Sequence, residues 1–104
     1  MKILALERES LDATAEQFER FGKAEARKVW DMHMAGVIRE LYFRSDENTA
    51  VLILECNSLR AAASFLSNLP YVQEGLVSFD LIPLHAYTGF SRLFSTDELS
   101  ALSY

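Results

Sequence analysis

The spacing of apolar residues changes several times along the chain, and each change predicts a new element of secondary structure. Residues 2–7 are apolar at both even and odd positions and end in charge, which predicts a short buried strand. From Leu11 onward the apolar positions recur at steps of three and four, which predicts a helix over residues 13–35. The stripe that this helix turns inward comprises Leu11, Ala15, Phe18, Gly22, Ala26, Val29 and His33.

The predicted first helix has typical residues at both ends. Asp12 or Thr14 can cap its start, and Gly36 suits a left-handed conformation just after its end. Gly22 lies within the inward stripe, where glycine weakens a helix by about 1 kcal/mol relative to alanine. It therefore either permits the close approach of another element or marks a bend.

Three further segments are predicted to be strands. Residues 37–44 and 49–56 are rich in branched and aromatic side chains, and the polar link 45–48 has a suitable length for a hairpin loop. Residues 76–84 give the fourth strand. The two middle strands should therefore pair antiparallel.

A second helix is predicted over residues 59–69, capped by Ser58 and ended by Pro70. Its apolar side comprises Leu59, Ala62, Leu66 and Leu69. The order strand, helix, strand, strand, helix, strand is the ferredoxin-like plan, in which both helices cover one face of a four-stranded antiparallel sheet. The sequence therefore predicts an α+β domain over residues 1–84.

Residues 85–104 are predicted to form a C-terminal arm. The arm is apolar at Tyr87, Phe90, Leu93 and Phe94, and residues 96–103 favour a short terminal turn of helix.

Two of the predicted strands carry apolar side chains on both faces. Residues 3–6 and 51–54 are apolar without interruption, whereas a strand with one covered face should alternate apolar and polar residues. Two helices can cover one face only, and the other would expose a larger apolar patch than monomers usually tolerate. We therefore predict a homodimer packed sheet to sheet, a dimeric α+β barrel. The alternative is that the arm folds back over its own sheet.

Composition limits the partners and the location. The chain has 104 residues and a formal net charge of -5, with 15 acidic and 10 basic residues, so neither nucleic acid nor an anionic membrane surface is an expected partner. The apolar stretch near the N-terminus is too short for a signal peptide or a membrane span. The single cysteine, Cys56, cannot form an internal disulfide, and a cytoplasmic location is expected.

Two segments carry a family resemblance. Residues 48–72 (NTAVLILECNSLRAAASFLSNLPYV) and 23–43 (KAEARKVWDMHMAGVIRELYF) resemble the muconolactone isomerase family of dimeric α+β barrel proteins, most evidently at Ser58, Leu66 and Leu69-Pro70. The resemblance covers about residues 1–84. It implies a sheet-to-sheet dimer, often assembled into a ring of dimers, with the C-terminal arm on a neighbouring subunit. It also implies proton transfer between carbons of an unsaturated lactone acid, without metal or organic cofactor, in a pocket between sheet and helices.

Two site residues follow from the resemblance. Glu25 matches an acidic position of the family, and Arg39 matches a strand arginine suited to a carboxylate. The chain departs from the family pattern at Ile38, where the family has tryptophan, and at residues 85–94 (HAYTGFSRLF), which replace a short polar C-terminus.

His33 is the most informative polar residue. It continues the inward stripe, and its imidazole titrates near neutral pH, as a general acid or base should. The alternatives are a core histidine and a cation at the C-terminal end of the helix dipole. Glu25 lies about two turns earlier, so both side chains can border one pocket, although a glutamate is more often solvated at the surface. Asp31 is two residues from His33 and does not face it.

Three other residues are candidates for substrate contacts. Arg39 and Tyr42 have opposite strand parity and need a bulge to reach the same cavity, so one of them should face the dimer interface. Trp30 lies beside the inward stripe and can wall a pocket or simply pack. Cys56 lacks a basic cluster that would activate it, and the histidines lack ligand partners, so neither a nucleophilic thiol nor a metal site is predicted.

These observations favour a small-molecule pocket protein that transfers a proton, without cofactor, on a small cyclic or carboxylated substrate. Glu25 or His33 would move the proton, and Arg39 or Tyr42 would hold oxygen atoms. The alternatives are a non-enzymatic dimer that binds a hydrophobic ligand or a protein, and a cofactor-free monooxygenase. His33 with a carboxylate and an arginine around a void would favour an enzyme, whereas a filled apolar interior would exclude one.

Overall fold

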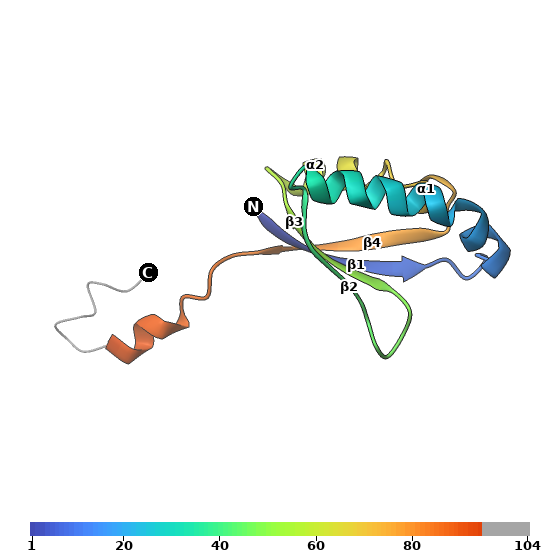
Figure 1. Ribbon diagram of the computed structural model, residues 1–104. Coiled ribbons are helices and arrows are strands. Elements are labelled where there is room, and N and C mark those ends of the chain that lie inside the picture. Colours follow the sequence, from blue (N-terminus) through green and yellow to red (C-terminus); the bar gives the residue numbers. More distant parts are fainter. Residues whose placement is uncertain (95–104) are drawn as a thin grey trace.

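The computed structural model describes residues 1–94 and shows a four-stranded sheet with helices on one face (Figure 1). All strand pairs are antiparallel, in the order β2-β3-β1-β4. The predicted ferredoxin-like α+β fold is therefore confirmed. Its elements are β1 (Lys2–Glu9), α1 (Ala15–Met34), β2 (Ile38–Phe43), β3 (Ala50–Glu55), α2 (Leu59–Leu66), α3 (Pro70–Gln73), β4 (Val77–Leu84) and the 3-10 helix η1 (Gly89–Phe94).

Helix α1 begins and ends as its sequence predicts. The Thr14 hydroxyl accepts the backbone N–H of Gln17, and the Gln17 side chain accepts the backbone N–H of Thr14, which completes a capping box. After the helix, Gly36 has a φ of 82°, and its N–H donates to the carbonyl of His33 at 3.1 Å. A side chain at position 36 would be strained in this conformation.

The second helical segment differs from the prediction. The Ser58 hydroxyl accepts the N–H of Ala61 at 3.0 Å and caps α2, as expected, but α2 ends at Leu66. Pro70 then begins a separate short helix, α3, rather than only ending the one before it. Proline is well suited to the first position of a helix, because the N–H that it lacks would have no partner there.

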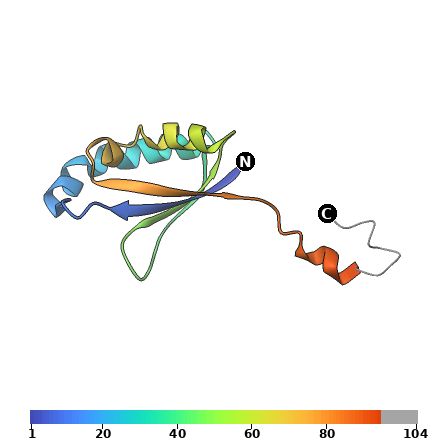
Figure 2. The ribbon, with the colours of Figure 1, turned by 180° about the vertical axis from the view of Figure 1, so that it is seen from behind.

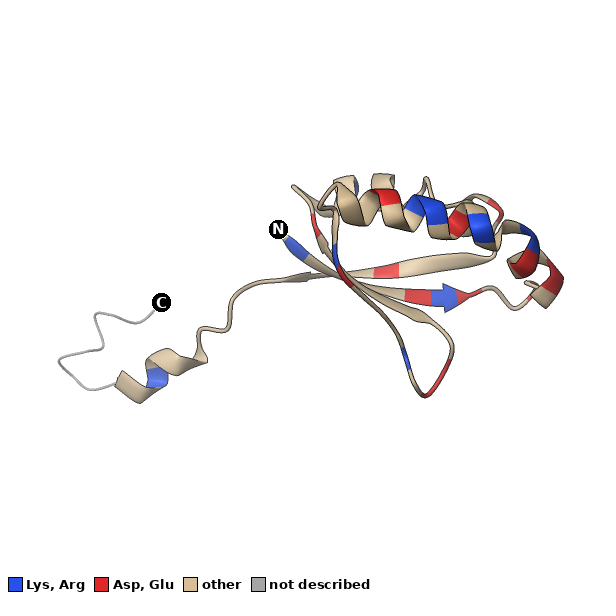
Figure 3. Cartoon of the chain, viewed as in Figure 1, with Lys and Arg blue, Asp and Glu red and all other residues tan. Residues whose placement is uncertain are grey.

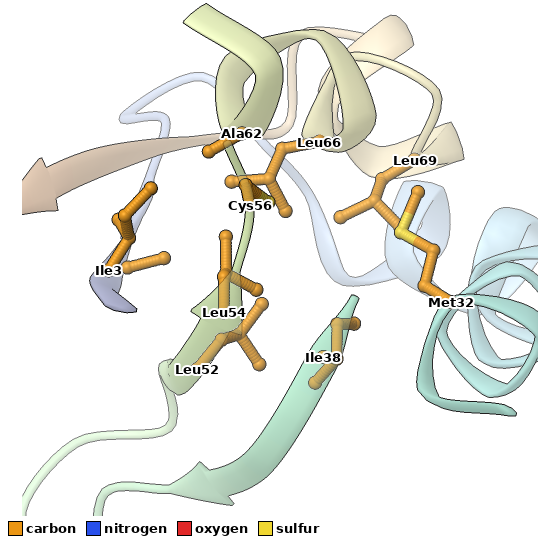
Figure 4. Close-up of a cluster of buried hydrophobic side chains, with 10 residues drawn as sticks. Ile3, Met32, Ile38, Leu52, Leu54, Cys56, Ala62, Leu66 and Leu69 are labelled. Carbon is orange, nitrogen blue, oxygen red and sulfur yellow. The ribbon is translucent and has the colours of Figure 1, made fainter. Parts of the chain in front are cut away.

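The core lies between the sheet and the helices that cover it (Figure 4). On β1, Ile3 and Ala5 point toward the helices and are completely buried. They meet side chains of the same face on β3 and on α2 and the end of α1. The core cluster comprises Ile3, Ala5, Met32, Ile38, Leu52, Leu54, Cys56, Ala62, Leu66 and Leu69.

Within residues 1–94, no helix covers the opposite face of the sheet (Figures 1 and 2). In the strand register, Leu4 lies opposite Ile53 and Ile82, which places these side chains together on this face. Ile82 is 40% exposed. We call this surface the outer sheet face; its apolar residues are Leu4, Leu6, Val51, Ile53, Ile82 and Leu84.

Strand β2 contains a bulge between Ile38 and Glu40, in which Arg39 is the extra residue. Ile38 faces the helices before the bulge. After it, Leu41 faces the helices and Tyr42 lies on the outer sheet face, because an inserted residue reverses the alternation of side chains.

Residues 85–94 of the arm lead away from the sheet (Figure 2). Tyr87, Phe90 and Leu93 are 71%, 67% and 76% exposed. This part of the arm has few charged residues. The charged residues of the chain lie mainly along α1 and in the β2–β3 connection (Figure 3). In the described residues the arm therefore does not fold back over its own sheet. The predicted turn at residues 96–103 lies outside the described residues.

Candidate functional site

A pocket of about 860 Å³ lies between α1 and the helix-side face of the sheet. The predicted inward stripe of α1 lines it through Ala15, Phe18, Gly22, Ala26, Val29 and His33. Leu11 does not belong to this stripe, because it precedes the helix and is fully exposed. The sequence therefore identified the helix face that borders the pocket, except at its first position.

The walls of the pocket are largely apolar and aromatic, and its charged residues are acidic. The aromatic lining residues are Phe18, Trp30, Tyr42, Phe43, Tyr71 and Phe79. Glu7, Glu9 and Glu25 are the charged ones, and neither lysine nor arginine is present among the residues described as lining the pocket. The pocket thus combines aromatic surface with negative charge.

Glu25, in the middle of α1, is 9% exposed, so the expectation of a solvated surface glutamate is wrong. Its Oε1 accepts the backbone N–H of Tyr71 at 2.9 Å. This N–H belongs to the first turn of α3, whose N-cap residue Leu69, just before the helix, makes no side-chain cap. Glu25 therefore caps α3 from another helix and places a carboxylate at its positive end.

Burial raises the pKa of Glu25 above its ordinary value, because the ionised carboxylate loses solvation. The hydrogen bond from Tyr71 opposes this shift, and the nearby negative charge of Glu7 adds to it. A carboxyl group that can hold a proton closer to neutral pH is suited to proton transfer.

Glu7 is a lining residue that the sequence analysis missed. Its Oε1 accepts the backbone N–H of Ala50 at 3.2 Å. Burial raises the pKa of Glu7 most, and the charge of Glu9 raises it further. The signal was its strand parity, because Glu7 continues the helix-side series of Ile3 and Ala5.

Tyr71 joins α3 to α1 beside the pocket. Its hydroxyl donates to the carbonyl of Phe18 at 3.1 Å, and the two rings meet edge to face with centroids 5.0 Å apart. Burial raises the pKa of Tyr71, and the charge of Glu25 adds to the effect. A methyl group at Gly22 would lie 3.3 Å from this hydroxyl, so Gly22 permits the close approach.

His33 lies in the last turn of α1 and borders the pocket. Its Nδ1 lies 2.8 Å from the carbonyl oxygen of Ile38, which can only accept, so Nδ1 carries the hydrogen. When the ring is neutral with this tautomer, Nε2 is its acceptor. His33 is exposed, so it is not a core histidine, whereas Asp31 forms an ion pair with Arg27.

The pocket includes all but one of the predicted site residues. Trp30 lines it and is 58% exposed. Tyr42 also lines it, although its hydroxyl donates to Glu40 at 2.7 Å on the outer sheet face. Arg39 is not a lining residue, and its Nε donates to the carbonyl of Gly36 at 2.6 Å. The structure thus gathers Glu25, His33 and Trp30 at the pocket; the side chain of Tyr42 belongs to the outer sheet face, and Arg39 is not a lining residue.

Other chemistry finds less support in residues 1–94. In this range, no three His, Cys, Asp or Glu side chains are grouped so that they could hold a metal ion. Burial raises the pKa of the Cys56 thiol, which disfavours the thiolate. No helix in the same range is both long and apolar enough to cross a membrane.

The fold has known counterparts. Muconolactone isomerase superposes with a TM-score of 0.69 at 13% identity, over 84% of this chain and 91% of that chain. The 5-chloro-2-hydroxyhydroquinone dehydrochlorinase from Burkholderia phenoliruptrix AC1100, in complex with 2,5-dihydroxybenzoquinone, gives 0.68 at 15% identity, over 86% and 98%. No family model and no curated protein matches the sequence. The chain therefore has a muconolactone isomerase-like fold, as its sequence predicts, and this similarity concerns the fold alone.

Proposed function

We propose that the protein binds a small cyclic molecule beneath α1 and moves a proton on it without a cofactor, as an isomerase does. One observation carries the proposal: a carboxylate that is 9% exposed and has a raised pKa lines an aromatic pocket. General bases are usually tuned toward neutral pH in this way, by burial in a pocket.

Glu25 and His33 have complementary parts in this proposal. Glu25 takes a proton from a carbon of the substrate and returns it to another carbon, so that no net proton is gained or lost. Nε2 of His33 is a second acceptor on the same pocket. Trp30 and Phe18 supply aromatic contacts to the ring.

The comparisons support an enzyme of this general kind. The two solved structures named above are enzymes, one an isomerase and one a dehydrochlorinase bound to a dihydroxybenzoquinone. The void, His33 and a carboxylate meet three of the four features expected of an enzyme, and the arginine is missing. Arg39 does not line the pocket, and the charged lining residues are acidic. We therefore propose a cyclic substrate without a carboxylate group.

Deuterium exchange tests the proposal. The protein is incubated in D₂O with a panel of cyclic enones and unsaturated lactones, and NMR follows deuterium entering ring carbons and double bonds that move. Glu25→Gln should slow exchange by about 100-fold or more. The matched control is Glu19→Gln, an exposed position on the same helix, which should leave the rate unchanged.

The other outcomes separate the alternatives. Ligand binding without deuterium exchange would contradict the enzymatic function and favour a non-enzymatic ligand-binding protein. Oxygen uptake with quinol substrates, in place of exchange, would identify a cofactor-free monooxygenase. Exchange that persists in Glu25→Gln but stops in His33→Asn would move the proton-transfer role to His33.

We also propose that a second copy of the chain covers the outer sheet face. Ile82 and Leu84 are 40% and 38% exposed there, beside the apolar side chains of β1 and β3. The exposed aromatic residues of the arm would then pack on a neighbouring subunit, in a dimer or a ring of dimers. Light scattering after gel filtration tests this, because a stable monomer of 11.8 kDa would contradict it.

A further inference from the structure

We infer that the pocket beneath α1 selects a protonated amine carried on a small ring, with Glu7 as a second binding residue beside Glu25. The inference deepens the proposed function, on which it rests for the location of the ligand. It concerns the charge of the ligand and not the reaction.

The carboxylates of the pocket lack counter-charges. No ion pair of Glu7, Glu9 or Glu25 exists among the described residues, and no lysine or arginine of that part of the chain lines the pocket. A carboxylate as buried as Glu25 is normally paired, because burying an isolated charge is costly. A cationic ligand would supply the missing charge.

Each of these two carboxylates has one oxygen without a hydrogen bond from the described residues. Glu25 and Glu7 each use Oε1 to accept one backbone N–H, from Tyr71 and Ala50 respectively. The second oxygen of each carboxylate receives no hydrogen bond from the described residues. An ammonium group has three donors and no acceptor, so it suits these free oxygens, and the two carboxylates are near enough for the charge of Glu7 to raise the pKa of Glu25.

Aromatic side chains line the pocket near the carboxylates. Phe18 and Tyr71 line the pocket beside Glu25, and Trp30 lines it in the part of α1 nearest its C-terminal end. The face of an aromatic ring attracts a cation within about 6 Å of its centroid. A pocket of about 860 Å³ also leaves room for the ring that carries the amine.

Ligands of other charge fit less well. A carboxylate would meet three side chains of its own sign, which disfavours it at close range. A neutral alcohol could donate to one carboxylate oxygen but would leave the charge uncompensated. The pocket should therefore rank ligands of equal shape by charge.

Three probes of similar size test this ranking, namely benzylamine, benzyl alcohol and benzoate, each titrated at about pH 7. Trp30 is the only tryptophan of the chain and lines the pocket, so its fluorescence reports binding, with calorimetry as the second readout. Benzylamine should bind at least about tenfold more tightly than benzyl alcohol, and benzoate should bind most weakly. Equal binding, tighter binding of benzoate, or no binding of benzylamine would overturn the inference.

Variants identify the residues responsible. Glu7→Gln and Glu25→Gln should each reduce the ratio of amine to alcohol affinity, whereas Glu19→Gln on the exposed side of α1 should not. Circular dichroism checks that each variant is folded, and Glu7→Gln retains the test if Glu25→Gln is not. If the pocket prefers the amine but no deuterium exchange occurs, the proposed enzymatic function is contradicted and this inference stands. If neutral substrates exchange deuterium but the pocket shows no preference for the amine, the enzymatic function stands and this inference is contradicted.

Discussion

Replacing Glu25 separates its structural role from its charge. In Glu25→Ala the N–H of Tyr71 loses its acceptor, and α3 loses its only observed side-chain cap. Loss of a helix cap costs about 1 kcal/mol, and the lost burial of one methylene costs about 0.8 kcal/mol more. The free energy of unfolding should therefore fall by about 2 kcal/mol, which lowers the melting temperature by roughly 10 °C.

Glu25→Gln is the matched variant, because its amide oxygen can still accept the N–H of Tyr71 while the charge is gone. The pKa of Glu25 is raised in the folded protein, so the folded state binds more protons than the unfolded state just above the ordinary value of 4.5. Stability of the unmodified protein should therefore fall as pH rises through that window. The Glu25→Gln variant should not lose stability in this way, because its side chain does not titrate.

Urea unfolding at about pH 4 and about pH 8, at one protein concentration, measures both effects. At the lower pH the Gln variant should match the unmodified protein, and the Ala variant should be less stable. At the higher pH the Gln variant should be the most stable of the three. The reasoning fails if Ala and Gln behave alike at low pH, or if the Gln variant gains nothing as pH rises.

Three further predictions concern the rest of the fold. Ser58→Ala should lower the free energy of unfolding by about 1 kcal/mol, while Ser64→Ala on the exposed side of α2 should not; equal effects in chemical denaturation would contradict the cap. Cys56 should react slowly with a thiol reagent at neutral pH and rapidly in urea, because burial raises its pKa; fast labelling of the folded protein would contradict this. Ile53→Glu should convert the proposed dimer to a folded monomer in light scattering, and an unchanged mass would remove β3 from the interface.

The strands and α1 could be predicted because the signals were local. Branched and apolar residues identified the strands, and Thr14 and Gly36 fixed the ends of α1 within a residue or two. Helix α3 was missed because Pro70 both follows one helix and begins the next. A proline after a helix reads as a stop, and only the tertiary structure shows that a new helix starts there.

The candidate site was harder to predict, because its chemistry depends on burial. Glu25 lies beside the apolar stripe, and its burial depends on α3 supplying a hydrogen bond from a residue 46 positions away. The sequence around Glu25 gives no local signal for this contact. Glu7 could have been found by strand parity, but a charged residue at the end of a strand usually reads as the point where the strand leaves the core.

The bulge at Arg39 determines which side chains of β2 point to each face of the sheet. If Arg39 were paired regularly, with no bulge, the alternation from Ile38 would place Glu40 and Tyr42 under the helices and turn Leu41 outward. The pocket would gain another acid and a phenol, and the opposite face would gain a leucine. Whether residue 39 is bulged or regularly paired therefore sets the character of two surfaces at once, whereas deletion of Arg39 would leave Glu40, Leu41 and Tyr42 on their present faces.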